Sequence, residues 1–118
     1  MGPLMMLGEH EGPEDAWGEL QLVGARKRER HRISLERLEQ GVLLGRYERC
    51  GIPLAELNDV SRVHLLLVQM GEELWAIDTA STNGTWQDEA RIETTTLDDL
   101  DSLKLGDALQ LQWLRLHA

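Results

Sequence analysis

Apolar and polar residues alternate with a period of two along much of this chain. The alternation is clearest at Leu20-Gln21-Leu22, Leu74-Trp75-Ala76-Ile77 and Leu109-Gln110-Leu111-Gln112-Trp113. Successive side chains of a strand point to opposite faces, so this pattern predicts β-strands with one face in a core. Turn-forming residues separate these runs at short intervals: Gly24-Ala25, Gly41, Gly71, Asn83-Gly84 and Gly106-Asp107. Many short strands joined by tight turns indicate an all-β sandwich.

Two features of the apolar pattern modify this expectation. Residues 63–68 are almost continuously apolar, which predicts a strand buried on both faces. After Trp113 the apolar positions change from odd to even numbers, at Leu114 and Leu116. Such a change of phase is expected where a β-bulge shifts the register, so a bulge is predicted in the last strand.

Two short segments have helical rather than strand spacing. Leu35 and Leu38 precede Gly41 in the first, and the second places Leu97, Leu100 and Leu103 before Gly106. Three-residue spacing brings side chains to one face of a helix. Both segments are too short to change the fold class.

The length of 118 residues suits one domain with one core. Residues 1–15 mix Gly, Pro, Met and acids without a period, so they are predicted to be a disordered tail or an expression remnant, and the domain is expected over 16–118. One cysteine, Cys50, excludes an intramolecular disulfide and fits a reducing compartment. Without a signal peptide or an apolar run of about 20 residues, a soluble, cytoplasmic protein without membrane contact is expected.

The net charge of −9 is unevenly distributed along the sequence. Residues 24–50 carry eight Lys or Arg against four acids, whereas the segments on either side are acidic. Nucleic-acid binding needs a broad basic face that contacts many phosphates, so this distribution disfavours it. Recognition of one or two phosphates remains compatible with it.

Three short polar segments interrupt the apolar pattern: Gly45-Arg46, Ser61-Arg62-Val63-His64 and Asp78–Thr85. Each combines turn-forming residues with hydrogen-bond donors, namely an Arg, Ser and Thr hydroxyls, or an Asn amide. Three loops with such donors are expected to converge on one anionic ligand. This indicates recognition rather than catalysis.

Arg46 and the Ser61 segment have both functional and structural interpretations. Arg46 follows a strand and a glycine, so its guanidinium is expected to leave the sheet end, where it either binds phosphate or pairs with Glu48. Ser61 and His64 are three apart and face opposite sides of an extended segment, which argues against a nucleophile–base pair. His64 is therefore expected to hold loops together. Arg62 either lines the site or is solvated at its rim.

The third polar segment follows a strand at Ile77-Asp78 and precedes one at Thr85-Trp86. Asn83-Gly84 within it is a hairpin signal, because both residues tolerate positive φ. Asn83-Gly84-Thr85 also matches a glycosylation sequon, but a chain without a secretory signal does not meet that machinery.

Together the three segments resemble the pattern of the forkhead-associated (FHA) domain family: G-R, then S-R-x-H, then D-x-x-S-x-N-G-T. The lead-in Val42-Leu43-Leu44, the strand before Asp78 and Leu105-Gly106-Asp107 match as well, so the resemblance covers the chain from about Trp17 onward. It implies a β-sandwich of about eleven strands whose loops at one end bind phosphothreonine peptides. The implied partner is a phosphothreonine-containing protein or peptide, either a Ser/Thr kinase or its substrate.

The resemblance also implies a role for individual residues. Arg46 and Ser61 contact phosphate, Thr82 assists, and Arg62 helps to bind phosphate or selects a neighbouring side chain. Asn83 binds the peptide main chain. The residues expected to support the loops are Gly45, His64 and Gly84. No catalytic residue, cofactor or metal is expected.

One departure from the family pattern concerns peptide preference. Gly51-Ile52 stands where family members often have Asp-Ile, and Glu56 and Asp59 place negative charge near the expected site. We therefore expect weaker binding of very acidic peptides and a preference for a basic or apolar residue after the phosphothreonine. Cys50 in the same loop is most simply a small packing residue.

Two other functions are alternatives. In the first, the protein is a scaffold that uses this fold for phosphate-independent association in a secretion or signalling assembly; an intact set of Arg46, Ser61 and Asn83 argues against it. A small hydrolase would use Ser61 or Ser81 with His64 and Asp78. It is the least favoured reading, because the sequence has no nucleophile-elbow motif and its hydroxyls lack an evident base.

Overall fold

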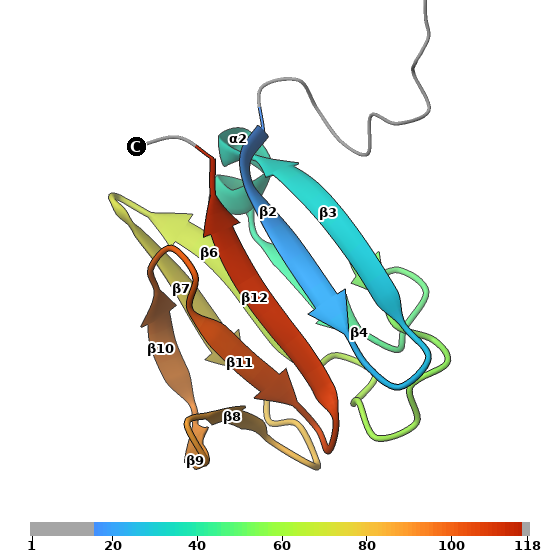
Figure 1. The fold of residues 1–118 in the computed structure, drawn as a ribbon. Helices are drawn as coiled ribbons and strands as arrows, with labels where there is room; N and C mark the ends of the chain where they lie inside the picture. Colours follow the sequence, from blue (N-terminus) through green and yellow to red (C-terminus); the bar gives the residue numbers. More distant parts are fainter. Residues whose placement is uncertain (1–15, 117–118) are drawn as a thin grey trace, which may run out of the picture.

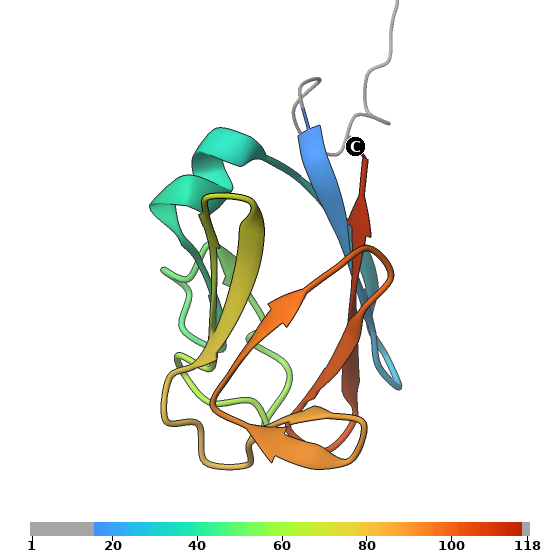
Figure 2. The ribbon, with the colours of Figure 1, turned by 90° about the vertical axis from the view of Figure 1, so that its left-hand side faces the viewer.

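Two β-sheets packed face to face form the body of the protein (Figures 1 and 2). The structure is a computed structural model that describes residues 16–116, so the predicted tail at 1–15 lies outside the described residues. The described part contains eleven strands and one short helix. The prediction of an all-β sandwich of about eleven strands is therefore confirmed.

One sheet has six strands and the other has five. The first contains, in spatial order, β3 (Arg28–Ser34), β2 (Ala16–Val23), β12 (Leu109–Arg115), β11 (Ser102–Leu105), β8 (Thr85–Gln87) and β9 (Ala90–Ile92). The second contains, in spatial order, β10 (Thr94–Leu97), β7 (Glu73–Asp78), β6 (Leu65–Met70), β4 (Val42–Gly45) and β5 (Ile52–Pro53). The helix α2 (Leu35–Gln40) leads from β3 to β4.

The core lies between the two sheets and is built from alternate strand residues. Leu20 and Leu22 of one sheet and Leu65 and Leu67 of the other are fully buried, and Trp113 is the largest side chain among the fully buried residues. Burial of these apolar surfaces is the main favourable contribution to folding. The period-two pattern of the sequence therefore corresponds to a real inner face.

The strand expected to be buried on both faces has only one buried face. In β6, Leu65 and Leu67 are buried, whereas Leu66 and Val68 are half-buried. A two-layer sandwich has no second layer on the outside of either sheet, so the outward residues of even a central strand stay partly accessible. The prediction of a strand was right and that of two buried faces was wrong.

The bulge expected in the last strand is absent there. β12 pairs with β2 without a shift from Gln110 opposite Val23 to Arg115 opposite Gly18. The register shift lies instead between β2 and β3, at residues 16–18. Leu114 and Leu116 do not enter the core, since the first is half-buried and the second is 42% exposed. The change of phase thus marks the end of the inner face.

One of the two segments with helical spacing is a helix. At the start of α2 the Ser34 hydroxyl oxygen accepts a hydrogen bond from the Arg37 N–H at 3.2 Å, and Gly41 ends the helix with φ of 94°.

The segment at residues 97–103 forms two strands and a turn instead. Leu97 ends β10, Leu103 lies in β11, and Leu100 between them has φ of 75° and is 59% exposed. Its N–H donates to the Trp113 carbonyl, so the three-residue spacing spans a turn here.

The loops that carry the three polar segments lie at the opposite end of the sandwich from the two ends of the described chain (Figure 1). Leu116 donates a backbone hydrogen bond to the Trp17 carbonyl at 3.0 Å, which holds the two ends together. The loops that follow β4, β5 and β7 gather at the other end, next to the β2–β3 and β11–β12 turns. Within residues 16–116, no helix is long and apolar enough to cross a lipid bilayer.

Candidate functional site

The first two polar segments meet through their backbones. The Arg46 N–H donates to the Ser61 carbonyl and the Tyr47 N–H to the Arg62 carbonyl, both at 3.0 Å. Gly45 makes this approach possible, because a Cβ there would lie 2.2 Å from the Arg62 carbonyl oxygen. The glycine before Arg46 is thus required by close packing of two backbone segments.

The Arg46 side chain is held by one of its nitrogens. Its Nε donates to the Val60 carbonyl at 2.6 Å, and the side chain is half-buried. No hydrogen bond or ion pair with a described residue uses its two terminal amino groups, and no pair with Glu48 is formed. The guanidinium is therefore oriented, and its two terminal amino groups can still donate to an anion.

The Ser61 hydroxyl links the second polar segment to the third. Its oxygen accepts a hydrogen bond from the Thr82 N–H at 2.9 Å. The hydroxyl hydrogen of Ser61 can donate to a further acceptor. Thr82 and Arg62 are both exposed. Arg46, Ser61 and Thr82 thus form a connected series through backbone and hydroxyl hydrogen bonds.

His64 is fully buried and also links the second polar segment to the third. Its Nδ1 accepts from the Ser61 N–H at 3.0 Å, so Nε2 carries the proton and donates to the Gly84 carbonyl at 2.9 Å. Burial lowers the pKa of His64, although the Gly84 carbonyl and the charge of Asp78 act in the opposite direction. A neutral imidazole with both nitrogens occupied fixes the spacing of the two loops.

Asp78 organises the third segment through its carboxylate. Its two oxygens accept from the Ser81 N–H at 2.8 Å, the Ser81 hydroxyl at 2.5 Å and the Thr85 hydroxyl at 2.7 Å. Burial alone would raise the pKa of Asp78, but these hydrogen bonds outweigh it and the pKa is lowered. The Ser81 oxygen in turn accepts from the Gly84 N–H at 3.1 Å. The segment is therefore fixed by its own side chains.

This third segment is not the hairpin that Asn83-Gly84 predicted. It runs from β7 in one sheet to β8 in the other, so the flanking strands do not pair. Gly84 has φ of 92°, but Asn83 is not among the described residues with positive φ. The hydrogen bonds to Asp78 and His64 determine this loop in place of a hairpin ladder.

Asn83 is exposed, and its side-chain amide is already oriented. Nδ2 donates to the Asp59 carbonyl at 2.9 Å, which leaves Oδ1 to accept from another group. A carboxylate oxygen of Asp59 accepts from the Asp107 N–H at 2.6 Å. Asp59 thus connects Asn83 to the turn between β11 and β12.

Two supporting residues were not recognised in this role from the sequence. From the sequence, Asp59 is expected only to place negative charge near the site, and no expectation involves Arg91. The Arg91 guanidinium donates to the Ser81 carbonyl at 3.0 Å and lies 6.0 Å from the centre of the Trp86 ring. Neither residue could be recognised from a motif, because Asp59 contacts Asn83 and Arg91 contacts Ser81 only in the folded arrangement of the loops.

The arrangement does not support hydrolysis. Both His64 nitrogens bind backbone groups, the Ser61 oxygen accepts from Thr82, and the Ser81 hydroxyl donates to Asp78. No hydroxyl in this cluster is bonded to an imidazole that could take its proton. Among the residues that the structure describes, no group of three or more His, Cys, Asp and Glu side chains is placed to hold a metal ion.

Comparison with known proteins identifies the family to which this site is similar. The family model described as "FHA domain" matches residues 42–106, which is more than half of the chain and contains all three polar segments. A search of curated proteins found no match.

Solved structures share the fold over most of this chain. The FHA domain of FhaA, crystallised with the intracellular domain of Rv3910, is 26% identical with a TM-score of 0.68, and the match covers 81% of this chain and 98% of that chain. A domain from a study of phosphothreonine-dependent FHA domain interactions is 28% identical with a TM-score of 0.66, over 86% and 97%. The Slr1951 protein from Synechocystis sp. is 19% identical with a TM-score of 0.73, over 86% and 97%, which shows similarity of fold alone.

Proposed function

This chain belongs to the FHA domain family, and from that membership we propose that it is a binding module for phosphothreonine in a partner protein. The observation that carries the proposal is the connected series of Arg46, Ser61 and Thr82. Their hydrogen bonds place an oriented guanidinium, a hydroxyl and an exposed threonine at one end of the sandwich. A phosphate with about −1.5 to −2 charge and three acceptor oxygens complements these donors.

The remaining residues complete this proposal. Arg62 is exposed beside Ser61 and either adds a second positive charge for the phosphate or contacts a neighbouring peptide side chain. The Oδ1 of Asn83 accepts a main-chain N–H of the bound peptide, since its Nδ2 is occupied by Asp59. Gly45, His64 and Gly84 hold the loops. We propose a Ser/Thr kinase or a substrate of one as the partner, by analogy with the phosphothreonine-dependent interactions studied for a related domain.

The charges around the site refine the expected peptide preference. Glu56 is engaged by the Lys27 ammonium at 2.9 Å, so its charge is largely compensated. The Asp59 carboxylate accepts from Asp107 but has no cationic partner among the described residues. The negative charge of Asp59 therefore supports the preference for a basic or apolar residue after the phosphothreonine. An oriented phosphothreonine library enriched in acidic residues at these positions would contradict it.

Calorimetric titration of one peptide in three forms tests the central proposal. The phosphothreonine form is expected to bind, while the phosphoserine and unphosphorylated forms bind weakly. Arg46→Ala removes a charge-assisted pair worth about 1.5–3 kcal/mol and should weaken binding about 10- to 100-fold. Arg46→Lys keeps the charge without the planar fork and should recover only part of the affinity.

Arg49→Ala is the matched control, because Arg49 is an exposed arginine in the same loop. It should bind within about threefold of wild type, as expected for a solvated surface charge. Equal affinity for all three peptide forms would reject phosphothreonine recognition. Retained complex formation by Arg46→Ala with an isolated partner would indicate phosphate-independent association instead.

A further inference from the structure

The strand β3 forms an open edge of the six-stranded sheet. It has one neighbour, β2, and no described backbone hydrogen bond outside that ladder uses its residues. Alternate N–H and C=O groups of an edge strand point away from its neighbour and can pair with another chain. A hollow of about 670 Å³ follows this strand; the residues that line it are Gln21, Val23, Arg28, Glu29, Arg30 and His31.

The outer face of β3 carries a row of three arginines. Arg28, Arg30 and Arg32 alternate along the strand and are all exposed. Arg32 contacts Glu19 of β2 at 3.3 Å, whereas Arg28 and Arg30 have no hydrogen bond or ion pair with a described residue. Opposite Arg28 and Arg30, β2 presents Val23 and Gln21, which carry no charge. The row therefore has a net positive charge in a chain of net charge −9.

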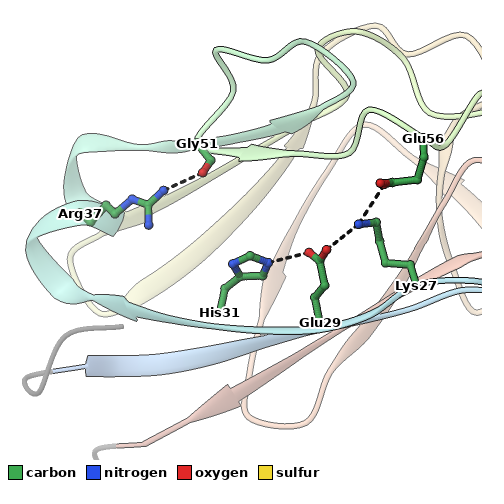
Figure 3. A network of polar contacts seen from close by, with 6 residues as sticks. All are labelled: Lys27, Glu29, His31, Arg37, Gly51 and Glu56. Atoms are coloured by element: carbon green, nitrogen blue, oxygen red, sulfur yellow. Dashed lines mark hydrogen bonds and ion pairs between the residues drawn. The ribbon is translucent and has the colours of Figure 1, made fainter. Parts of the chain in front are cut away.

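The one acidic residue of β3, Glu29, is paired with residues of this domain. Glu29 points to the other face of β3, where it contacts Lys27 at 2.6 Å and His31 at 2.9 Å (Figure 3). Lys27 is buried and also binds Glu56 in the loop before the phosphate site. Hydrogen bonds from Lys27 lower the pKa of Glu29 against the effect of burial, so Glu29 stays ionised and paired on that side. It does not compensate the arginines on the outer face.

We propose that the edge of β3 docks an extended acidic segment of a partner protein. The segment adds as a strand beside β3, with main-chain hydrogen bonds to the open edge, and alternate carboxylates lie along the row of Arg28, Arg30 and Arg32. β3 has seven residues, so a segment of about six residues spans it. This site is separate from Arg46 and does not require phosphorylation. It gives the domain a second contact with a partner.

The charge pattern favours an acidic peptide over the other occupants. A second copy pairing through β3 would bring two arginine rows side by side, and like charges across a ladder are destabilising. A single nucleic-acid strand needs open aromatic rings for its bases. Trp86 on the same sheet is already contacted by Lys104 at 5.7 Å and Arg91 at 6.0 Å from its centroid.

Fluorescence anisotropy with a labelled, unphosphorylated peptide of alternating Glu and Thr tests this site. Wild-type protein is expected to bind with a Kd on the order of 100 μM at low salt, and about tenfold more weakly at high salt because the contacts are exposed. Arg28→Glu with Arg30→Glu should weaken binding at least about tenfold. A peptide with proline at alternate positions, which lacks the N–H groups for pairing, should also lose affinity.

Matched controls separate this site from the phosphate site. Arg49→Gln changes the net charge as Arg30→Gln does, but at an exposed arginine outside β3 that has no side-chain partner among the described residues, and should bind the acidic peptide within about twofold of wild type. Arg46→Ala should also leave this affinity unchanged. If the double variant does not fold, the single Arg30→Gln should still weaken binding about threefold.

Four results would overturn the proposal. If the wild-type protein does not bind the acidic peptide, or if the charge-reversed variants bind it with wild-type affinity, the arginines serve only to protect the edge of the sheet from aggregation. If a single-stranded oligonucleotide displaces the peptide at lower concentration, and Arg30→Gln weakens its binding too, the surface recognises nucleic acid. If the peptide shifts amide resonances elsewhere and leaves those of residues 28–34 unchanged, the peptide binds at another site.

Discussion

Replacing Gly45 by alanine tests the close contact on which the site depends. The added Cβ would lie 2.2 Å from the Arg62 carbonyl oxygen and 2.9 Å from the Val63 Cα, whereas ordinary contact begins at 3.4 Å. These neighbours are backbone atoms, so no side-chain rotation relieves the overlap. Gly45 is not among the described residues with positive φ, so the expected effect is steric.

The size of the loss in unfolding free energy depends on the backbone segment that the new Cβ displaces. Overpacking a well-packed interior costs typically about 1–3 kcal/mol, and a rigid backbone neighbour places Gly45→Ala at the upper end. The displaced segment carries the hydrogen bond from the Arg46 N–H to the Ser61 carbonyl, whose loss adds about 1 kcal/mol. We expect a total loss of about 3–4 kcal/mol and a melting temperature lowered by about 10 °C or more.

Urea unfolding followed by tryptophan fluorescence measures this loss, and Gly71→Ala is the control. Gly71 has φ of 63° and no atom within 4 Å of an added Cβ, so its replacement costs only backbone strain of about 1 kcal/mol. Affinity for the phosphothreonine peptide should be measured below the unfolding transition. Gly45→Ala should then bind more weakly than wild type, while Gly71→Ala binds equally well.

Two outcomes would refute this reasoning. If Gly45→Ala is no less stable than Gly71→Ala, the two backbone segments do not approach as the structure shows. If Gly45→Ala is destabilised but its folded form binds phosphothreonine with wild-type affinity, the position of Arg46 relative to Ser61 does not control recognition.

Three further predictions concern His64, Asp78 and Cys50. Burial depresses the pKa of His64, so its contribution to the unfolding free energy should be complete above about pH 6.5 and decline as the pH falls toward the folded-state pKa. His64→Ala should abolish that decline in a pH series of urea titrations and cost about 3 kcal/mol at neutral pH. Asp78→Asn should cost about 2 kcal/mol and make the loss of stability below about pH 4 smaller without abolishing it, because the pKa of Asp78 is depressed together with those of Glu19, Glu29 and Glu56; an unchanged acid profile would contradict this. Burial raises the pKa of the Cys50 thiol, so iodoacetamide should label it at least about tenfold more slowly in the folded than in the unfolded protein.

The sandwich could be predicted because its signals are local. Alternation at Leu20–Leu22 and Leu109–Trp113 follows directly from the two faces of a strand, and the spacing of Leu35 and Leu38 before Gly41 is that of the short helix α2. The leucine spacing at 97–103 wrongly indicated a helix, because periodicity does not reveal that Leu100 has a left-handed backbone conformation within a turn. Periodicity records residue type, whereas backbone conformation at a turn depends on the strands that the turn joins.

The candidate site could be predicted in its motifs but not in its connections. The three polar segments identified Arg46, Ser61 and Asn83 as donors at loops. The side chains of Arg46 and Asn83 are oriented by the carbonyls of Val60 and Asp59, which any residue type could supply. Backbone acceptors leave no mark on the sequence, so only the folded arrangement shows why these side chains are oriented.

The hydrogen bond between Leu116 and the Trp17 carbonyl has a practical consequence for measurement. Both ends of the described chain lie at the end of the sandwich opposite the loops (Figure 1). A biosensor surface or fluorescent protein attached at either end therefore leaves the loop end facing solution. The same proximity suits circular permutation: a short linker could join the two ends, and new termini could be opened at the Gly71 turn between β6 and β7.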